Sequence, residues 1–232
     1  MTERNSQIQN HARAMVREAL HFRRATKSFD PNRIIPDEDW AVIIEAAVMA
    51  PSSNHLDPFN LLVIQDSALR EQLVEKAAGA QAGQFRTASH LVAITAKAGA
   101  QMRPGSPHLA HLRQDIMQFP PEQMAQWEAQ FAGFLTNMLG IPADDDRLVG
   151  EWTRHQAYIV LGMMMQTAAL LGIDSCPLEG LDFAAADAVL AEAGVHDPTV
   201  DPLAVMVAFG YRAGPPKRAS TRRPLAEIVK VV

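Results

Sequence analysis

The segment Ala157–Leu171 constrains this chain more than any other, because nearly all of its residues are apolar. A helix that is apolar on all sides must be buried all round in a globular protein. The run is shorter than the ~20 residues that a membrane span requires, and Gln166 interrupts it. In a chain of only 232 residues, we therefore expect a central helix sandwiched at a subunit interface, and no membrane span.

The strands and helices around this segment do not alternate as a regular βαβ series. Short apolar runs bounded by turn residues predict strands at Asn60–Ile64, Leu91–Thr95, Ile173–Cys176 and Leu203–Phe209. Helical periodicity predicts helices at His11–Phe22, from the cap Asp37, from the cap Ser67 to Ala78, at Glu151–Leu171 and at Phe183–Glu192. This order predicts an α+β fold with a small central mixed sheet wrapped by helices.

Residues 1–232 are interpreted as a single domain with a helical excursion at about residues 98–147. This segment is helical in pattern but polar, which suits an excursion from the core, such as a lid. We call residues 98–147 the excursion. The tail, Gly214–Val232, is rich in proline and arginine and becomes apolar at its end. Its apolar end either adds a strand to its own sheet or embraces a partner subunit.

Composition narrows the function classes. The net charge of −5 argues against a nucleic-acid partner, which normally requires a basic surface. The single cysteine, Cys176, permits no intrachain disulfide and suits a reducing cytoplasmic location. The dinucleotide, Walker A, zinc-protease and esterase motifs are all absent. His108 and His111, and the run Asp144–Asp146, are interpreted as solvated or helix-capping groups, so no metal is expected.

A basic cluster is the first candidate for a binding site. The segment Arg23–Phe29, which we call the clamp segment, directly follows the first predicted helix. It contains the three cations Arg23, Arg24 and Lys27. Such charges can simply complement a helix C-terminus. They can also hold a phosphate, since arginine offers a planar fork and lysine a point charge.

Three further segments are candidates for binding. The serine loop, Pro51–Phe59, is dense in hydrogen-bonding groups between two prolines, although a simple capped turn would look similar. Pro177–Gly180 ends a short strand, and Gly180 permits close backbone approach. Thr221–Leu225 is either a solvated basic patch or the source of one more arginine for a phosphate site.

In this order and spacing, the four segments resemble the FMN-dependent nitroreductase family, and in particular its oxygen-insensitive NAD(P)H nitroreductases, over about His21–Val232. The resemblance implies FMN as cofactor, NAD(P)H as co-substrate and a homodimer with FMN at the interface. The residues that it implies for cofactor binding are Arg23, Arg24, Ala25, Lys27, Pro51, Ser52, Ser53, His55, Gln81, Gln84, Pro177, Leu178, Glu179, Gly180 and Arg222. The serine loop would reach the flavin of the other subunit.

The chain also departs from the family pattern. His55 lies where the loop's asparagine is expected, and Asp57 replaces a glutamine. Gln84 and Ser220 stand where relatives often have lysine. Because cations stabilise the negative charge of reduced flavin, these replacements predict a more negative flavin potential or an altered substrate preference.

The implied activity is transfer of two electrons, as hydride, from NAD(P)H through the flavin to nitroaromatics or quinones, with ping-pong kinetics. No catalytic side chain is required, because water can supply protons. Phe131 and Phe134, with His55 across from them, are candidates for the substrate wall, although the phenylalanines could equally be core residues. Alternatives are an enone or semialdehyde reductase, a dehalogenase, a flavin-fragmenting enzyme, a non-catalytic flavin-binding protein, or a helical module without cofactor.

Overall fold

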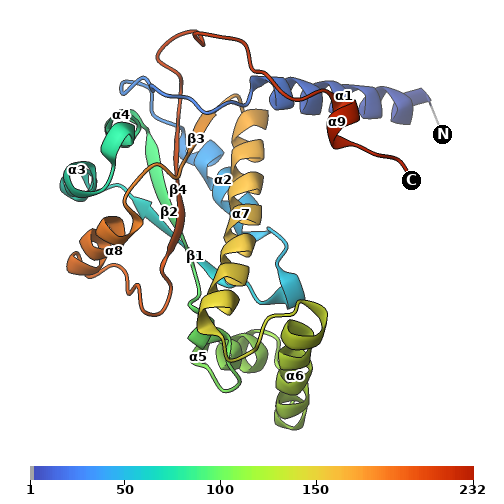
Figure 1. Ribbon diagram of the computed structural model, residues 1–232. Helices are drawn as coiled ribbons and strands as arrows, with labels where there is room; N and C mark the ends of the chain where they lie inside the picture. The colour runs from blue at the N-terminus through green and yellow to red at the C-terminus, as the bar shows by residue number, and fades with distance from the viewer. Residues whose placement is uncertain (1–2) are drawn as a thin grey trace.

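The computed structural model describes residues 3–232, with side chains from residue 7 onward, as a small sheet surrounded by helices (Figure 1). The strands are β1 (Phe59–Ile64), β2 (His90–Ala96), β3 (Asp174–Leu178) and β4 (Leu203–Gly210). The longer helices are α1 (Glu3–Phe22), α2 (Asp37–Val48), α3 (Ser67–Lys76), α6 (Pro121–Gly133), α7 (Asp146–Leu170) and α8 (Phe183–Glu192). The short ones are η1 (Ser53–His55), η2 (Gly79–Gln81), α4 (Ala82–Thr87), η3 (Gly99–Met102), α5 (Pro107–Ala110), η4 (His111–Ile116), η5 (Phe134–Met138) and α9 (Leu225–Ile228).

The sheet has the order β1-β2-β4-β3, and every neighbouring pair is antiparallel. The predicted α+β class is confirmed, but the prediction of a mixed sheet is wrong for these four strands. The helical connection between β1 and β2 begins and ends at the same end of the sheet, so it reverses the chain direction. A parallel pairing occurs only at the isolated bridge Ala25–Ser175, within the part of the chain that the structure describes.

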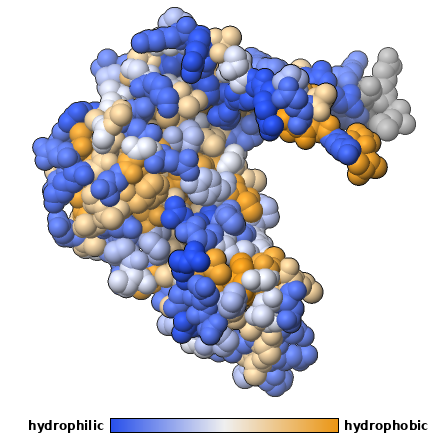
Figure 2. Space-filling view, viewed as in Figure 1, coloured by the Kyte–Doolittle hydropathy of each residue, from blue (hydrophilic) through white to orange (hydrophobic). Residues whose placement is uncertain are grey.

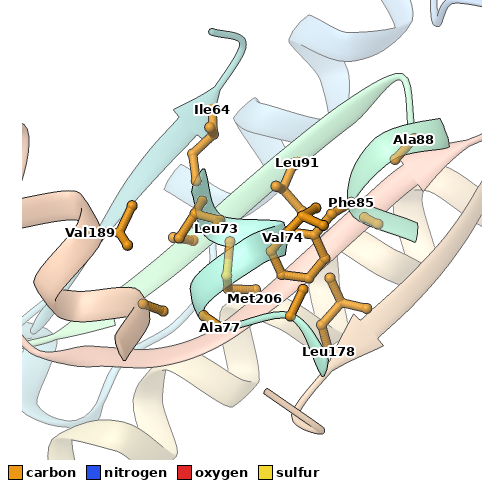
Figure 3. Close-up of a cluster of buried hydrophobic side chains, with 14 of the residues drawn as sticks. Ile64, Leu73, Val74, Ala77, Phe85, Ala88, Leu91, Leu178, Val189 and Met206 are labelled. Atoms are coloured by element: carbon orange, nitrogen blue, oxygen red, sulfur yellow. The ribbon is translucent and has the colours of Figure 1, made fainter. Parts of the chain in front are cut away.

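The two central strands are buried on both faces because alternate side chains enter two different cores. In β2, Leu91 and Ala93 face a core shared with α3, α4 and α8, which Figure 3 shows. Val92 and Ile94 face a second core, shared with α2 and α7. This double burial explains why β2 and β4 read as continuous apolar runs instead of alternating ones.

Helix α7 lies at the centre of the protomer, against α1, α2 and the sheet. It begins earlier than expected because the Asp145 carboxylate caps its N-terminus by accepting from Leu148 N at 3.0 Å. Ile159 nevertheless remains 40% exposed. The protomer alone therefore leaves part of this apolar helix uncovered. No helix among residues 3–232 combines the length and apolarity of a membrane span.

The excursion has a core of its own, formed by aromatic and aliphatic side chains together with Leu56 of the serine loop. Phe131, at 3% exposure, is one of its central residues and stacks with Trp127. Figure 1 shows this lobe below the sheet, beside the first turns of α7. The excursion is thus packed against both α7 and the serine loop.

The N-terminal helix and the tail project from the body in Figure 1. Helix α1 starts at Glu3, earlier than predicted, and Ala19 is the buried residue among its described side chains. The tail does not add a strand to the sheet of its own protomer, and Leu225 within it is 74% exposed. Figure 2 shows that this arm and the excursion lobe project on the same side and border a concave face.

A close backbone contact joins the excursion to α7. A Cβ atom added to Gly99 would lie 2.2 Å from the backbone oxygen of Asp146, so Gly99→Ala must push η3 away from α7. We expect a loss of about 1–3 kcal/mol of unfolding free energy, the usual cost of overpacking. Thermal unfolding measures it. Gly83→Ala, where a Cβ would meet nothing within 4 Å, is the matched control, and an equal Tm for both variants would contradict the contact.

His90 makes stability depend on pH. Its ring is buried and stacked on Trp40 at 4.0 Å, and burial, aided by the Arg70 guanidinium, lowers the pKa of His90. The unfolded chain then binds a proton more readily than the folded chain, so stability falls as pH drops below about 6.5. His90→Phe should flatten part of this fall in denaturant titrations between pH 7 and 5. An unchanged slope would contradict the assignment; the pKa of His108 is also lowered by burial, so some dependence remains.

Candidate functional site

The clamp segment is laid across the ends of β3 and β4. Thr26 N donates to Ser175 O at 3.1 Å, and Ala213 N donates to Ser28 O at 3.0 Å. Phe29 is buried and pairs with Arg212 through a β-bridge. These backbone contacts fix the segment on the sheet.

A buried carboxylate anchors this arrangement. Asp174, at the start of β3, accepts from Thr26 Oγ1 at 2.8 Å and from Arg212 Nε at 2.9 Å. Arg212 also forms a salt bridge from Nη2 to Asp174 Oδ1 at 2.7 Å, and its guanidinium lies 4.3 Å from the centre of the Phe22 ring. The charge of Arg212 is thus compensated inside the fold. This role was not predictable from the sequence, because Asp174 and Arg212 lie far apart along the chain.

A pocket of about 1000 Å³ opens between the clamp segment and the tail. It is lined by Arg23, Arg24, Ala25, Thr26, Lys27, Ser28, Pro177, Arg212, Ala213, Gly214, Pro215, Pro216, Lys217, Arg218, Ala219, Ser220, Thr221 and Arg222. None of these residues is acidic, and among the described residues Arg212 is the lining cation that forms a salt bridge. We call this the basic pocket.

The basic pocket joins predicted residues with unpredicted ones. The predicted cations Arg23, Arg24, Lys27 and Arg222 all line it, whereas Arg223 is not among its lining residues. Lys217 and Arg218 were not predicted as site residues, although the basic composition of the tail was a signal. Arg24 Nη2 donates to Arg218 O at 2.7 Å, so the clamp segment holds the tail directly.

The predicted glutamines meet the end of β3. The Gln81 side chain lies against Gly180, where an added Cβ would be 3.3 Å from Gln81 Nε2. Gln81 Oε1 is buried and has no hydrogen-bond partner in the protomer. Gln84 is buried beside the Cys176 thiol, which also accepts from Lys27 Nζ at 3.6 Å. The structure therefore brings Gln81, Gln84, Lys27 and the Pro177–Gly180 segment together.

Tyr158 of α7 fixes the acidic residue of this segment. Its hydroxyl donates to the Glu179 carboxylate. Burial, together with that hydrogen bond, raises the pKa of Tyr158 to about 12, so the phenol stays protonated and remains a donor. Glu179 is thereby held against α7.

The serine loop lies on a different side of α7. Ser53 N donates to Gln156 Oε1 at 2.9 Å, whereas Tyr158 contacts Glu179. Residues two apart on an α-helix point about 200° apart around its axis. Pro51, Ser52, Ser53 and His55 are absent from the lining of the basic pocket. One protomer therefore does not bring the two halves of the predicted site together.

The three candidates for a substrate wall differ in how far they are buried. Phe131 is a core residue of the excursion, whereas Phe134 is only partly buried and contacts Trp152 edge to face. His55 is exposed, with its Nε2 3.9 Å from Asp57 Oδ2. Leu56, next to it, packs in the same cluster as Phe131. The loop and the excursion are therefore neighbours.

Comparison with known proteins decides the family. The model of the nitroreductase family matches residues 20–211. The chain belongs to this family. A Staphylococcus aureus protein provisionally named an NAD(P)H nitroreductase is 40% identical over 217 residues, which cover 94% of this chain and 95% of that protein. YfkO of Bacillus subtilis, with the same provisional name, is 36% identical over 220 residues, covering 95% and 98%.

Solved structures share the fold. A provisionally named nitroreductase from Exiguobacterium sibiricum, solved in complex with FMN, has a TM-score of 0.67 at 21% identity and covers 94% of this chain and 97% of its own. An enone reductase of gut-bacterial fatty acid saturation has a TM-score of 0.75 at 18% identity, with the same coverage. The fold of this chain is therefore nitroreductase-like.

Proposed function

We propose that this protein is an FMN-dependent oxidoreductase that transfers two electrons from NAD(P)H to nitroaromatics or quinones in a ping-pong reaction. The observation that carries the proposal is the basic pocket, which has no acidic lining residue and whose arginines and lysines, apart from Arg212, form no salt bridge among the described residues. Membership of the nitroreductase family and relatives named NAD(P)H nitroreductase support it. The related fold solved with FMN supports the choice of cofactor.

The residues present fit FMN. Arginine forks and a lysine point charge suit a phosphate monoester, and the clamp segment supplies both in the form of Arg23 and Lys27. The unpartnered Gln81 Oε1 is free to accept a hydrogen bond from a ring N–H. Gly180 is exposed and has no side chain of its own, so Gln81 can lie directly against the end of β3 and place its amide beside the Pro177–Gly180 backbone.

Each part of the site then has a role. Bound FMN would accept and return the hydride. Arg23, Lys27 and Arg222 hold the phosphate, and Gln81 and Gln84 orient the polar edge of the ring. The backbone of Pro177–Gly180 supports the ring face. The two substrates use the exposed face in turn, and solvent supplies the protons, so no side chain is assigned as acid or base.

We also propose a homodimer in which each site is built from both subunits. The apolar residues left exposed on α1, α7 and the tail, such as Leu20, Ile159 and Leu225, support a large partner surface. Most of the stability of a helix in a protein comes from tertiary packing, and Ala19 is the buried residue among the described side chains of α1, so α1 requires a further packing surface. The serine loop, on the other side of α7 from Glu179, would contribute Ser52, Ser53 and His55 to the partner's flavin. Phe134, more than the buried Phe131, would contact the acceptor.

The visible spectrum tests the proposal directly. We expect the purified protein to be yellow with stoichiometric FMN, and anaerobic NADPH or NADH to bleach it. Adding a nitroaromatic or a quinone should then restore the oxidised spectrum, and steady-state rates should give parallel double-reciprocal lines. Protein that binds no FMN on reconstitution, or whose flavin neither nicotinamide cofactor reduces, would overturn the proposed function.

A further inference from the structure

The excursion contains a buried arginine. Arg113, in η4, is 3% exposed and forms no salt bridge within the described chain. Its guanidinium stacks 3.8 Å from the centre of the Trp127 ring, and its Nε has no hydrogen-bond partner. Burial lowers the pKa of Arg113, and the negative charge of Asp57 in the serine loop opposes that shift. A buried charge without a direct salt bridge is costly, so its other contacts must account for its presence.

One hydrogen bond of Arg113 joins the excursion to the serine loop. Arg113 Nη2 donates to the backbone oxygen of Asn54 at 2.8 Å, and Nη1 lies 2.6 Å from Met117 Sδ within the excursion itself. His108, expected to be solvated, is instead partly buried, and its Nε2 lies 2.9 Å from the Leu56 oxygen. Two side chains of the excursion therefore contact two loop carbonyls, those of Asn54 and Leu56, which lie two residues apart.

The loop they hold has an uncommon backbone conformation. Asn54, His55 and Asp57 have φ values of 55°, 53° and 38°, in the left-handed region, which costs free energy even for asparagine, histidine and aspartate, the residues other than glycine that adopt it most often. The contacts from the rest of the chain are therefore needed to keep this shape. On the body side, Gln156 of α7 hydrogen-bonds the loop through Ser53 N, and Leu56 packs with Val149 and Trp152 of the same helix.

We propose that Arg113 is a positioning residue that holds the serine loop in its left-handed conformation and so ties the shape of that loop to the excursion. A guanidinium can hold a carbonyl at this depth because its flat face packs on Trp127 while its edge donates. A shift of η4 then moves the loop. The coupling between η4 and the loop is argued from contacts within one chain, whereas its consequence for the flavin rests on the proposed function.

Amide hydrogen exchange tests the coupling without flavin. Ser53 N, His55 N and Asp57 N are each hydrogen-bonded in the loop. In apo Arg113→Gln we expect these amides to exchange roughly 10-fold or more faster, the factor that corresponds to losing a charge-assisted hydrogen bond. Arg113→Lys, which keeps a donor, should restore part of the protection. Arg103→Gln is the control, since Arg103 hydrogen-bonds Asp146 and the Asp144 carbonyl, both within the excursion, and not the loop.

Unchanged loop exchange in Arg113→Gln, or an equal rise in Arg103→Gln, would overturn the proposal. If Arg113→Gln does not fold, the comparison of Arg113→Lys with Arg103→Lys decides between the same two outcomes. A second measurement is made on the holoenzyme, where we expect Arg113→Gln to shift the flavin absorption bands and change the flavin redox potential, while Arg103→Gln leaves both as in the unmodified protein. Faster loop exchange with an unaltered flavin spectrum would support the coupling and refute the placement of the loop at the flavin.

Discussion

Arg23→Ala should weaken FMN binding by roughly 10–100-fold, because a charge-assisted hydrogen bond contributes about 1.5–3 kcal/mol. Arg23 lines the basic pocket and forms no salt bridge within the described chain, so its charge is available to a ligand. Titration of apoprotein with FMN, followed by quenching of flavin fluorescence, measures the change. The loss should be larger at low ionic strength, because salt screens exposed charges.

Arg223→Ala is the matched control for Arg23→Ala. Arg223 lies in the same basic tail but is not a lining residue of the pocket, so its removal changes net charge equally without removing a contact. We expect its FMN affinity to stay within about 2-fold of the unmodified protein, as for a surface charge. Purified Arg23→Ala that keeps stoichiometric flavin through dialysis would contradict the phosphate clamp.

The parts of the fold that the sequence predicted depend on local patterns. All four strands lie where short apolar runs end at turn residues, and α8 spans Phe183–Glu192 as expected. Strand direction was not predictable, because it depends on where each connection crosses the sheet. The length of α1 was underestimated, since its first turns are polar and carry no apolar period. The cap of α3 is Asp66 instead of Ser67, because its carboxylate accepts from Leu69 N at 2.7 Å.

In the candidate site, too, residues marked by a local pattern were predictable and residues placed by long-range contacts were not. Arg23, Arg24 and Lys27 were recognisable because three cations fall within five residues, and all three line the basic pocket. Arg212 was missed because its partner, Asp174, lies in another strand, and no local pattern marks a long-range ion pair. Arg113 was missed for a related reason. Its residue type predicts a solvated face, and only tertiary packing against Trp127 buries it.

A heterodimer that carries one lesion in each subunit should regain about half of the flavin of the unmodified dimer, if each site combines the clamp segment of one subunit with the serine loop of the other. One subunit would carry Arg23→Ala with Lys27→Ala, and the other Ser53→Trp, which fills the partly buried loop position. Each variant alone should form flavin-poor homodimers. Co-expression with two different affinity tags and tandem purification isolates the heterodimer, and its absorbance ratio at the flavin and protein bands gives the occupancy.

The expected half occupancy follows from the two-fold symmetry of such a dimer. One of the two sites receives both the damaged clamp segment and the damaged loop, while the other receives neither. If both halves of a site instead came from one protomer, every site would carry a lesion and the heterodimer would stay flavin-poor. In the protomer, the loop contacts α7 through Gln156 and the Pro177–Gly180 segment contacts it through Tyr158, on different sides of the helix. That separation is why we expect restoration, and a flavin-poor heterodimer would show that the loop serves its own subunit.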